Sequence, residues 1–313
     1  MELVGNILIT GGSGYLGSRM IDYCVRKFPH ATIYFTHHLE AKPDVFSSDE
    51  KINYRVLDLS NSTHFNDICL GIDFVIHLAF PNEIICGNNV QNSILNGEIG
   101  TYLLLEDALK HKVKKFIFLS TIHVYGDLNR QLDNLSPTEP IHPYGSIKCS
   151  AEFHVEYFRN KGLNTLILRL SNGFGSPYHK NINRHNLLFN DVCNQALSNG
   201  EIRLSSNGKK KLDFFSFSFL FKELFKLIEE DINQAIINFG SGNPISILEF
   251  VNKIRVILEK KHHKKTTLLL NENDKSEVND LFYYKTFKTL NNGEFDEYLE
   301  KEVELYLNYF NAF

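Results

Sequence analysis

Short apolar runs alternate with longer amphipathic segments through the first half of the chain. The apolar run Phe74–Leu78 is typical of a strand buried on both faces of a sheet. The predicted strands are Asn6–Thr10, Thr32–Thr36, Tyr54–Leu57, Phe74–Leu78, Lys115–Leu119 and Thr165–Leu170, and the predicted helices are Arg19–Lys27, Ser93–Lys112 and Tyr144–Asn160. Strands that alternate with helices predict an α/β fold with a doubly wound parallel sheet.

Composition excludes several classes of protein. The 313 residues are 22% charged and 43% hydrophobic, with a net charge of −4, which indicates a folded chain and a poor nucleic-acid binder. The sequence contains no apolar run of about 18 residues and no secretory leader, so we expect no membrane span and a cytoplasmic location. The five cysteines are widely spaced without a CxxC pair, and we therefore expect neither disulfides nor a metal site.

A glycine-rich turn, Thr10-Gly11-Gly12-Ser13-Gly14-Tyr15-Leu16-Gly17, joins the first predicted strand to the first helix. Gly11 permits the tight turn, Gly14 lets the backbone approach a pyrophosphate, and Gly17 lets the helix pack closely. The helix N-terminus adds N–H groups and a positive dipole for the anion. We therefore predict a Rossmann-type dinucleotide site here.

The end of the second predicted strand should select the cofactor, because an acidic residue there favours NAD and an arginine favours NADP. The sequence offers Thr36-His37-His38, which is neither, and the lack of arginine favours NAD without excluding NADP. The two histidines could equally be plain surface residues. Asp58 and Leu59, after the third strand, are placed for the adenine, although Asp58 could instead cap a helix.

After Asn172 the chain becomes rich in Asn, Gly, His and Lys. We predict a dinucleotide-binding domain over residues 1–172, whose sheet is completed by residues 213–240. A smaller C-terminal domain, built from residues 173–212 and 241–313, is expected to bind substrate.

Tyr144 and Lys148 lie four residues apart at the start of a predicted helix, so they share one face. The phenol, whose pKa is ordinarily about 10, becomes a usable proton acceptor when a cation stabilises its phenolate. Together with the hydroxyl of Thr121, which follows the fifth strand, the pair suits hydride transfer at a carbinol.

Several motifs together resemble the extended short-chain dehydrogenase/reductases, the nucleotide-sugar epimerase/dehydratase group. They run nearly from end to end of the chain: TGGSGYLG from Thr10, His77-Leu78-Ala79, STIHVYG from Ser120, Tyr144 with Lys148, LRLSNGFG from Leu168, and NFGSG from Asn238. The resemblance implies that Tyr144 is the acid/base, that Lys148 holds the nicotinamide ribose, and that Thr121 supplies the family's hydroxyl group that orients the substrate oxygen.

The resemblance also implies the binding residues. The cofactor would be held by Gly11, Gly14, Tyr15, Leu16, Gly17, Thr36, His37, Asp58, Leu59, Leu78, Ala79, Phe80, Tyr144, Lys148 and Ser171. The substrate would be held by His123, Asn172, Lys180, Arg184, Asn186, Lys211 and Lys275. Members of the group commonly dimerise through paired helices, here Ser93–Lys112 and Tyr144–Asn160, and we expect a homodimer.

Departures from the family pattern narrow the reaction. Ile122 and His123 stand where dehydratases carry Asp-Glu, and no cysteine adjoins the serine as in epimerase–reductases, so dehydration and 3,5-epimerisation are disfavoured. Leu212 replaces a phosphate-binding arginine. The family asparagine of the helix after the fourth strand falls on Gly97, beside Asn96.

The resulting expectation is an NAD-dependent enzyme acting at C4 of a nucleotide-activated sugar. The whole chain most resembles the 4-dehydrogenases of GDP-heptoses in capsular polysaccharide pathways. The alternatives are an NDP-hexose 4-epimerase, a reductase of a non-nucleotide ketone, and a non-enzymatic dinucleotide-sensing regulator.

Overall fold

The computed structural model of the chain describes residues 3–38, 46, 51–179, 182, 184–230, 234–275 and 279–312. The chain forms two compact units. Unit 1 comprises Met1–Asp127, Leu135–Leu170 and Leu224–Ile237, and unit 2 comprises Leu128–Asn134, Ser171–Glu223 and Asn238–Phe313. Residues 128–134 were expected in the first domain but belong to unit 2. The reason is that β6 (Gln131–Leu132) pairs with β15 (Tyr283–Tyr284).

A seven-stranded sheet forms the centre of unit 1, with the order β12-β7-β5-β4-β1-β2-β3. The strands are β1 (Gly5–Thr10), β2 (Ala31–His37), β3 (Ile52–Val56), β4 (Phe74–His77), β5 (Lys115–Thr121), β7 (Thr165–Leu170) and β12 (Ile236–Phe239). Neighbours from β3 to β7 pair in parallel, which confirms the predicted Rossmann-like fold. The strand order reverses between β1 and β4, where ligands bind in such sheets.

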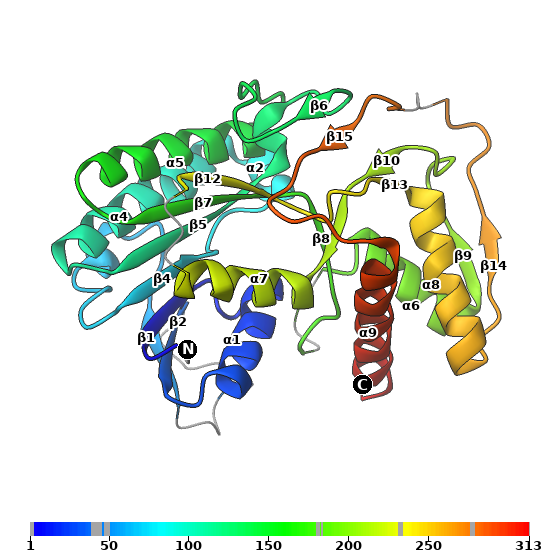
Figure 1. The fold of residues 1–313 in the computed structure, drawn as a ribbon, viewed down its shortest axis with the longest axis horizontal. Coiled ribbons are helices and arrows are strands. Elements are labelled where there is room, and N and C mark those ends of the chain that lie inside the picture. Colours follow the sequence, from blue (N-terminus) through cyan, green and yellow to red (C-terminus); the bar gives the residue numbers. More distant parts are fainter. Residues whose placement is uncertain are drawn as a thin grey trace. The chain divides into compact units, whose positions relative to one another are not determined.

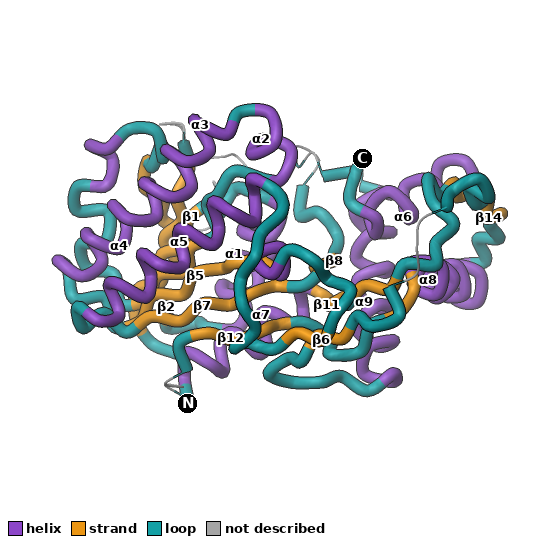
Figure 2. Tube along the Cα trace, turned by 90° about the horizontal axis from the view of Figure 1, so that it is seen from above, coloured by secondary structure: helices purple, strands orange, loops and turns teal. Residues whose placement is uncertain are grey.

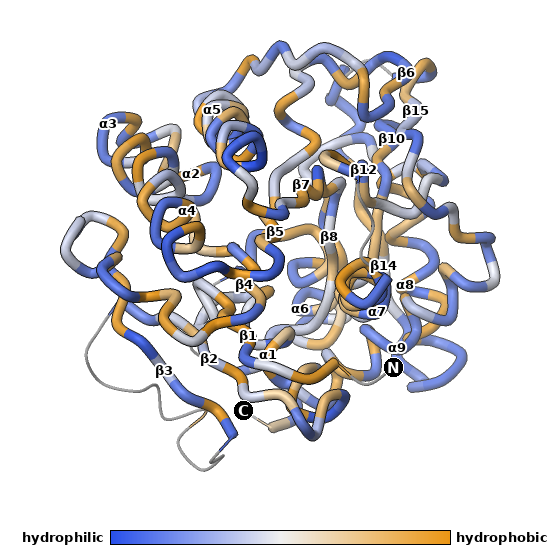
Figure 3. Tube along the Cα trace, turned by 60° about the vertical axis from the view of Figure 1, so that its left-hand side comes forward, coloured by the Kyte–Doolittle hydropathy of each residue, from blue (hydrophilic) through white to orange (hydrophobic). Residues whose placement is uncertain are grey.

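Helices cover both faces of this sheet (Figure 1). On one face α1 (Tyr15–Lys27) packs against β1 and β2, and on the other α5 (Pro143–Asn160) packs against β5 and β7. Figure 2 shows α4 (Gly100–Lys110) beside α5 across the strands. Their apolar faces and the strands share one buried core, so burial of this core fixes where the helices lie. The edge strand β3 carries both polar and apolar residues, as Figure 3 shows.

The predicted helix over 93–112 is a single helical path with a wider middle turn. Helix α3 (Val90–Ser93) continues into the π-helical segment η3 (Ile94–Ile99) and then into α4. A Cβ at Gly97 would lie 2.7 Å from the Phe80 ring, so the helix meets that ring closely. The short helices α2 (Glu83–Asn88), η2 (Ser62–Phe65) and η4 (Ile122–Tyr125) complete unit 1.

Unit 2 combines short two-stranded sheets with longer helices. Besides β6 and β15, its pairs are β8 (Asn172–Phe174) with β11 (Phe214–Ser216), β9 (Glu201–Arg203) with β14 (Thr267–Leu269), and β10 (Lys211–Leu212) with β13 (Ile245–Ser246). The helices are α6 (Leu188–Asn199), α7 (Phe217–Glu229, whose last turns belong to unit 1), α8 (Ile247–His262) and α9 (Asn292–Asn311). A core rich in phenylalanine joins α6, α8 and α9. Among the described residues no helix is both long and apolar enough to span a bilayer.

Candidate active site

The glycine turn adopts a conformation that only glycines tolerate. Gly11 has a φ of +67°, and its carbonyl accepts the N–H of Gly14 at 3.0 Å. A Cβ at Gly17 would lie 2.3 Å from that same carbonyl oxygen, so α1 packs directly against the turn at Gly17. Helix α1 begins at Tyr15, and its N-cap Gly14 supplies no capping side chain. The geometry therefore suits a pyrophosphate at the N-terminus of α1.

Two threonine hydroxyls accept backbone N–H groups in this turn and in the loop beside it. Thr36 Oγ1 accepts the Gly11 N–H at 3.1 Å. Thr10 Oγ1 accepts the N–H groups of Leu78 and Ala79, at 3.0 and 3.1 Å. The backbone after β4 is thus fastened to the end of β1, and a Cβ at Gly11 would lie 3.0 Å from Ala79. Thr36 was predicted to bind the cofactor, and the structure shows that its hydroxyl supports the turn.

His77 extends this support into the helical layer, a role that sequence reasoning missed. Its Nδ1 lies 2.7 Å from Thr10 Oγ1, and its Nε2 lies 3.0 Å from Thr101 Oγ1. Since Thr10 Oγ1 already accepts two N–H groups, its proton goes to Nδ1, and His77 carries its own proton on Nε2. Burial lowers the pKa of His77 to about 3, so the ring stays neutral.

The predicted adenosine-binding residues lie at the ends of β2 and β3. His37 is half-buried, and its ring lies 4.7 Å from that of the exposed His38. Asp58 Oδ1 accepts both the N–H and the hydroxyl of Ser60, and these bonds lower the pKa of the carboxyl group. Asn61, rather than Asp58, caps η2. Leu59 packs against the core of unit 1.

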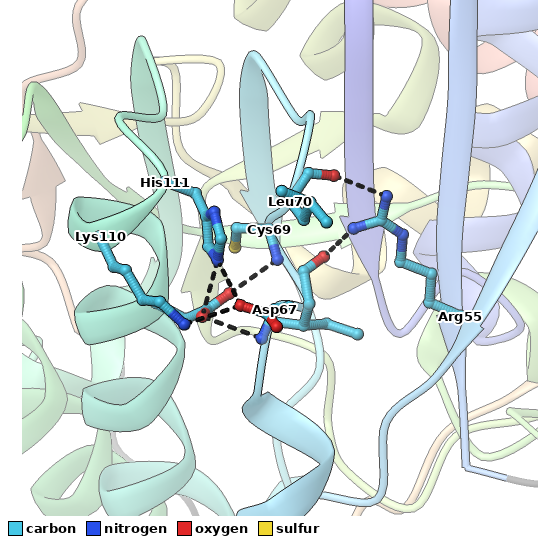
Figure 4. Close-up of polar contacts among 8 residues, drawn as sticks. Arg55, Asp67, Cys69, Leu70, Lys110 and His111 are labelled. Carbon is cyan, nitrogen blue, oxygen red and sulfur yellow. Dashed lines mark hydrogen bonds and ion pairs between the residues drawn. The ribbon is translucent and has the colours of Figure 1, made fainter.

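Arg55 lies in β3, and its guanidinium binds backbone carbonyls away from the end of β2. It donates to the carbonyls of Ile68 and Leu70, as Figure 4 shows. Among the described residues at the end of β2, no arginine is present for a 2′-phosphate. A described end of β2 without an arginine fits NAD rather than NADP. In the glycine turn, Gly11, Gly14 and Gly17 would hold the pyrophosphate of NAD.

The three predicted catalytic residues come from two adjacent elements of unit 1. Thr121 is the last residue of β5, and its hydroxyl accepts the His123 N–H at 3.2 Å. Tyr144 lies in the first turn of α5, and Lys148 follows one turn later. The rings of Phe80 and His123 both stand edge-on to the Tyr144 ring, with centroids 6.3 and 6.2 Å away.

Lys148 is buried in a mainly aromatic pocket. Its Nζ donates to the Leu119 carbonyl at 2.6 Å. The same atom lies 3.8 Å from the Phe80 ring centroid and 4.5 Å from that of Phe118. Burial lowers the pKa of Lys148 to about 7. The ammonium is therefore poised to change its charge near neutral pH.

A buried ion pair that sequence reasoning missed lies beside these residues. Glu152, one turn beyond Lys148, accepts from Arg169 Nε at 3.1 Å and from its Nη2 at 2.7 Å. Ser120 donates its hydroxyl to Glu152, and Arg169 Nη1 donates to the Tyr125 hydroxyl at 2.9 Å. The sequence does show a glutamate four residues after Lys148 and an arginine in the LRLSN run. Nothing in their spacing indicates that the two side chains form an ion pair.

The other predicted binding residues belong to unit 2. Ser171 donates its hydroxyl to the buried Asp213, whose carboxylate also accepts from Ser241. Asn172 donates its side-chain amide to the Asp213 carbonyl at 3.0 Å. Burial raises the pKa of Asp213, a residue that the sequence analysis did not single out.

The remaining predicted substrate residues are cationic or amide side chains. Lys211 Nζ lies 3.3 Å from Asp280, Arg184 is half-buried, and Asn186 and Lys275 are exposed. Lys180 lies outside the described residues. Leu212 packs against the core of unit 2, which accounts for an apolar residue at that position.

One group of side chains in the described part of the chain has the spacing of a metal site. Asp67, Asp107 and His111 offer ligand atoms within 4.8 Å of one another. These groups already have partners: Lys110 Nζ lies 2.7 Å from Asp67, and Asp107 accepts the N–H groups of Asp67 and Cys69. Figure 4 shows Lys110 and His111 turned toward Asp67. We interpret the group as an ion-pair network that holds the 67–69 loop.

Comparison with known proteins identifies the family to which the chain belongs. Residues 7–238 match the family described as "NAD dependent epimerase/dehydratase family". A dTDP-D-glucose 4,6-dehydratase of Dictyostelium discoideum is 26% identical over 80% of this chain and 62% of its own length. A putative UDP-glucose 4-epimerase of Methanocaldococcus jannaschii is 28% identical over 80% of this chain and 81% of its own length.

A solved structure shares the fold over nearly the whole chain. It is a dTDP-glucose 4,6-dehydratase from Bacillus anthracis in complex with NAD, with a TM-score of 0.78 and 18% identity. The match covers 97% of each chain. The resemblance that the motifs indicated is thus confirmed at the level of the family. The family is described as NAD dependent, in agreement with the predicted cofactor NAD. The chain belongs to the NAD-dependent epimerase/dehydratase family.

Proposed function

We propose that this protein uses NAD to oxidise the C4 carbinol of a nucleotide-activated sugar. The observation that carries the proposal is the placement of Thr121, Tyr144 and Lys148 in one unit with the glycine turn. They lie at the carboxyl end of β5 and in the first turns of α5. That end of a doubly wound sheet is where ligands bind.

The oxidation removes a hydride from C4 and a proton from its hydroxyl group, which leaves a ketone. When bound, NAD supplies the ring that accepts the hydride. Thr121 orients the hydroxyl group, and the Tyr144 phenolate takes its proton. The Lys148 ammonium stabilises that phenolate, because a nearby cation favours the charged form of a phenol.

Neighbouring side chains argue against dehydration. Ile122 is buried and His123 is exposed, and neither offers the carboxylate that sugar dehydratases carry after the threonine. We therefore propose oxidation and reduction at C4 without loss of water, although relatives named as dehydratases resemble the chain. We propose that His123, beside the Tyr144 ring, contacts the sugar.

For the substrate, we propose first a GDP-heptose that is released as its 4-keto product, as in capsule sugar biosynthesis. The support is the resemblance of the whole chain. The alternative is an NDP-hexose 4-epimerase, which relatives named as 4-epimerases favour. In both cases Asn172, Arg184, Asn186, Lys211 and Lys275 of unit 2, with Lys180, would bind the nucleotide diphosphate.

Turnover of a substrate panel tests these proposals. We expect the purified protein, given NAD and a GDP-heptose, to form NADH and a product two hydrogens lighter, as measured by absorbance and mass spectrometry. An isomer formed without net NADH, from GDP-heptose or a UDP-hexose, would establish the epimerase instead. Loss of water would contradict redox chemistry at C4 without dehydration, and reduction of free ketones alone would contradict a nucleotide-sugar substrate.

We also propose that two copies of the chain associate through unit 1. Its helices expose large apolar side chains on one connected set of elements: Ile84 and Ile85 on α2, Val90 on α3, Ile94, Leu95 and Ile99 on η3, and Phe153 and Tyr157 on α5. These elements pack against one another. An apolar surface of this extent favours a protein partner, and a second copy presents the same surface.

Phe153→Glu is expected to convert the dimer to a monomer. Phe153 is 63% exposed in the chain, so a glutamate costs little in the monomer but would bury a charge in the interface. Light scattering after size exclusion measures the mass. Leu281→Glu, at a residue 68% exposed in unit 2, is the matched control and should leave the mass unchanged. A wild-type chain that is monomeric at micromolar concentration would contradict the proposal.

A further inference from the structure

The end of β5 is fastened to α5 at consecutive residues. The Leu119 carbonyl accepts the Lys148 ammonium, and the Ser120 hydroxyl donates to Glu152. The next residue is Thr121. Lys148 and Glu152 lie one turn apart on α5, on the same face as Tyr144. Thr121 is therefore held in place relative to Tyr144 through the contacts of its two predecessors.

Arg169 locks this arrangement from the neighbouring strand. In the sheet register it lies beside Ser120, and its guanidinium binds Glu152 through Nε and Nη2. Its remaining nitrogen Nη1 donates to Tyr125 in η4, whose ring lies 4.9 Å from the guanidinium carbon. Glu152 thus joins α5, β5 and β7, and through Arg169 also η4.

The charges around Lys148 single out Glu152. Besides Tyr144, three titratable groups among the described residues interact electrostatically with the ammonium: His77 from β4, Cys86 from α2 and Glu152 from its own helix. His77 is neutral because burial lowers its pKa to about 3, and the Cys86 thiol is neutral because burial raises its pKa. Of these three groups, Glu152 is therefore the anion that favours the ammonium form of Lys148.

We propose that Glu152 is a positioning residue that keeps Lys148 in its ammonium form and holds Thr121 at the end of β5. The catalytic part of this inference rests on the proposed function, but the effect on Lys148 does not. A buried carboxylate is stable as an anion only when it has a charged or hydrogen-bonding partner. Arg169 is that partner and keeps Glu152 ionised. The proposal assigns a role in the reaction to a residue that touches neither substrate nor cofactor.

The test compares Glu152→Gln with a double variant, Glu152→Gln/Arg169→Gln. The single variant leaves Arg169 buried without its anion and so risks misfolding. The double variant removes both charges, and it keeps the proposal testable if the single variant does not fold. Glu156→Gln, at a half-buried residue one turn further along α5, is the matched control.

The direct readout is the titration of Lys148, followed by NMR of ¹³C-labelled lysine and assigned with Lys148→Met. Without the Glu152 carboxylate, Lys148 should lose its proton about one pH unit lower than in the wild type. Glu152→Asp should recover part of the shift, and Glu156→Gln should show none. Unchanged titration of Lys148 in both Glu152→Gln and the double variant would overturn the proposal.

Hydride transfer supplies the second readout. Because an ammonium fraction falls tenfold per pH unit above its pKa, the rate of the Glu152→Gln variant should fall about tenfold at pH 8 but only about twofold at pH 6. A uniform loss at both pH values would indicate a merely structural role and would overturn the charge assignment. If no nucleotide sugar is oxidised but Lys148 titrates lower, the proposed function fails, and only the effect of Glu152 on Lys148 stands.

Discussion

Tyr144→Phe is expected to lower the rate of sugar oxidation by about a hundredfold to ten-thousandfold. The substitution removes the phenol oxygen that takes the proton from the carbinol, and general acid–base groups contribute rate factors of this size. The ring itself should stay in place, because phenylalanine preserves its edge contacts with the rings of Phe80 and His123. Stopped-flow measurement of NADH formation gives the rate.

The affinity for NADH separates this loss from a general failure of the site. A phenyl ring keeps the ring packing around position 144, so fluorescence titration with NADH should give nearly the wild-type dissociation constant. Tyr157→Phe provides the matched control, since Tyr157 lies on the same helix but is 46% exposed. The Tyr157→Phe variant should oxidise the sugar at the wild-type rate. Wild-type oxidation by Tyr144→Phe would show that another group accepts the proton.

The strands and the glycine turn could be predicted because their signals are local. The strand Thr165–Leu170 was predicted with the bounds that the structure shows, since its apolar residues are consecutive in the chain. The start of α5 was predicted one residue late, at Tyr144, and Pro143 at the first helical position is also a local signal. The sheet needed only the rule that strands separated by helices pair in parallel.

The supports of the site could not be predicted, because each depends on a partner distant in the chain. Glu152 and Arg169 are 17 residues apart and meet only once β7 lies beside β5. Thr10 and His77 are 67 residues apart, and a buried histidine in an apolar run gives no indication of which hydroxyl it will meet. Pairing of this kind is a property of the assembled sheet.

The boundaries of the two units and the π-helical segment also follow from tertiary packing. Residues 128–134 read as a loop of the first domain until β6 pairs with β15, more than 150 residues later in the sequence. In the segment Ile94–Ile99, helical periodicity could not reveal the wider turn at Gly97, because the turn fits against Phe80 from another loop. Local propensity is overridden where such contacts form.

Gly17→Ala is expected to weaken NADH binding about ten- to hundredfold. The added methyl group would lie 2.3 Å from the Gly11 carbonyl oxygen and 2.7 Å from Gly12 Cα, both of them backbone atoms that cannot rotate away. Overpacking of this kind costs about 1–3 kcal/mol, and here relief requires the pyrophosphate turn to move away from α1. Fluorescence titration with NADH measures the loss, and circular dichroism shows whether the fold persists.

Gly100→Ala is the control that separates a shifted turn from any effect of adding a methyl group. Its Cβ would meet only side-chain carbons of Leu59 and Phe65 at 3.5 Å, which is ordinary contact, and Gly100 is helical, where alanine is favoured by about 0.5–1 kcal/mol. That variant should bind NADH as the wild type does and melt no lower. Equal NADH affinity in Gly17→Ala and Gly100→Ala would show that the turn tolerates displacement, and the pyrophosphate would then have to be held by other groups.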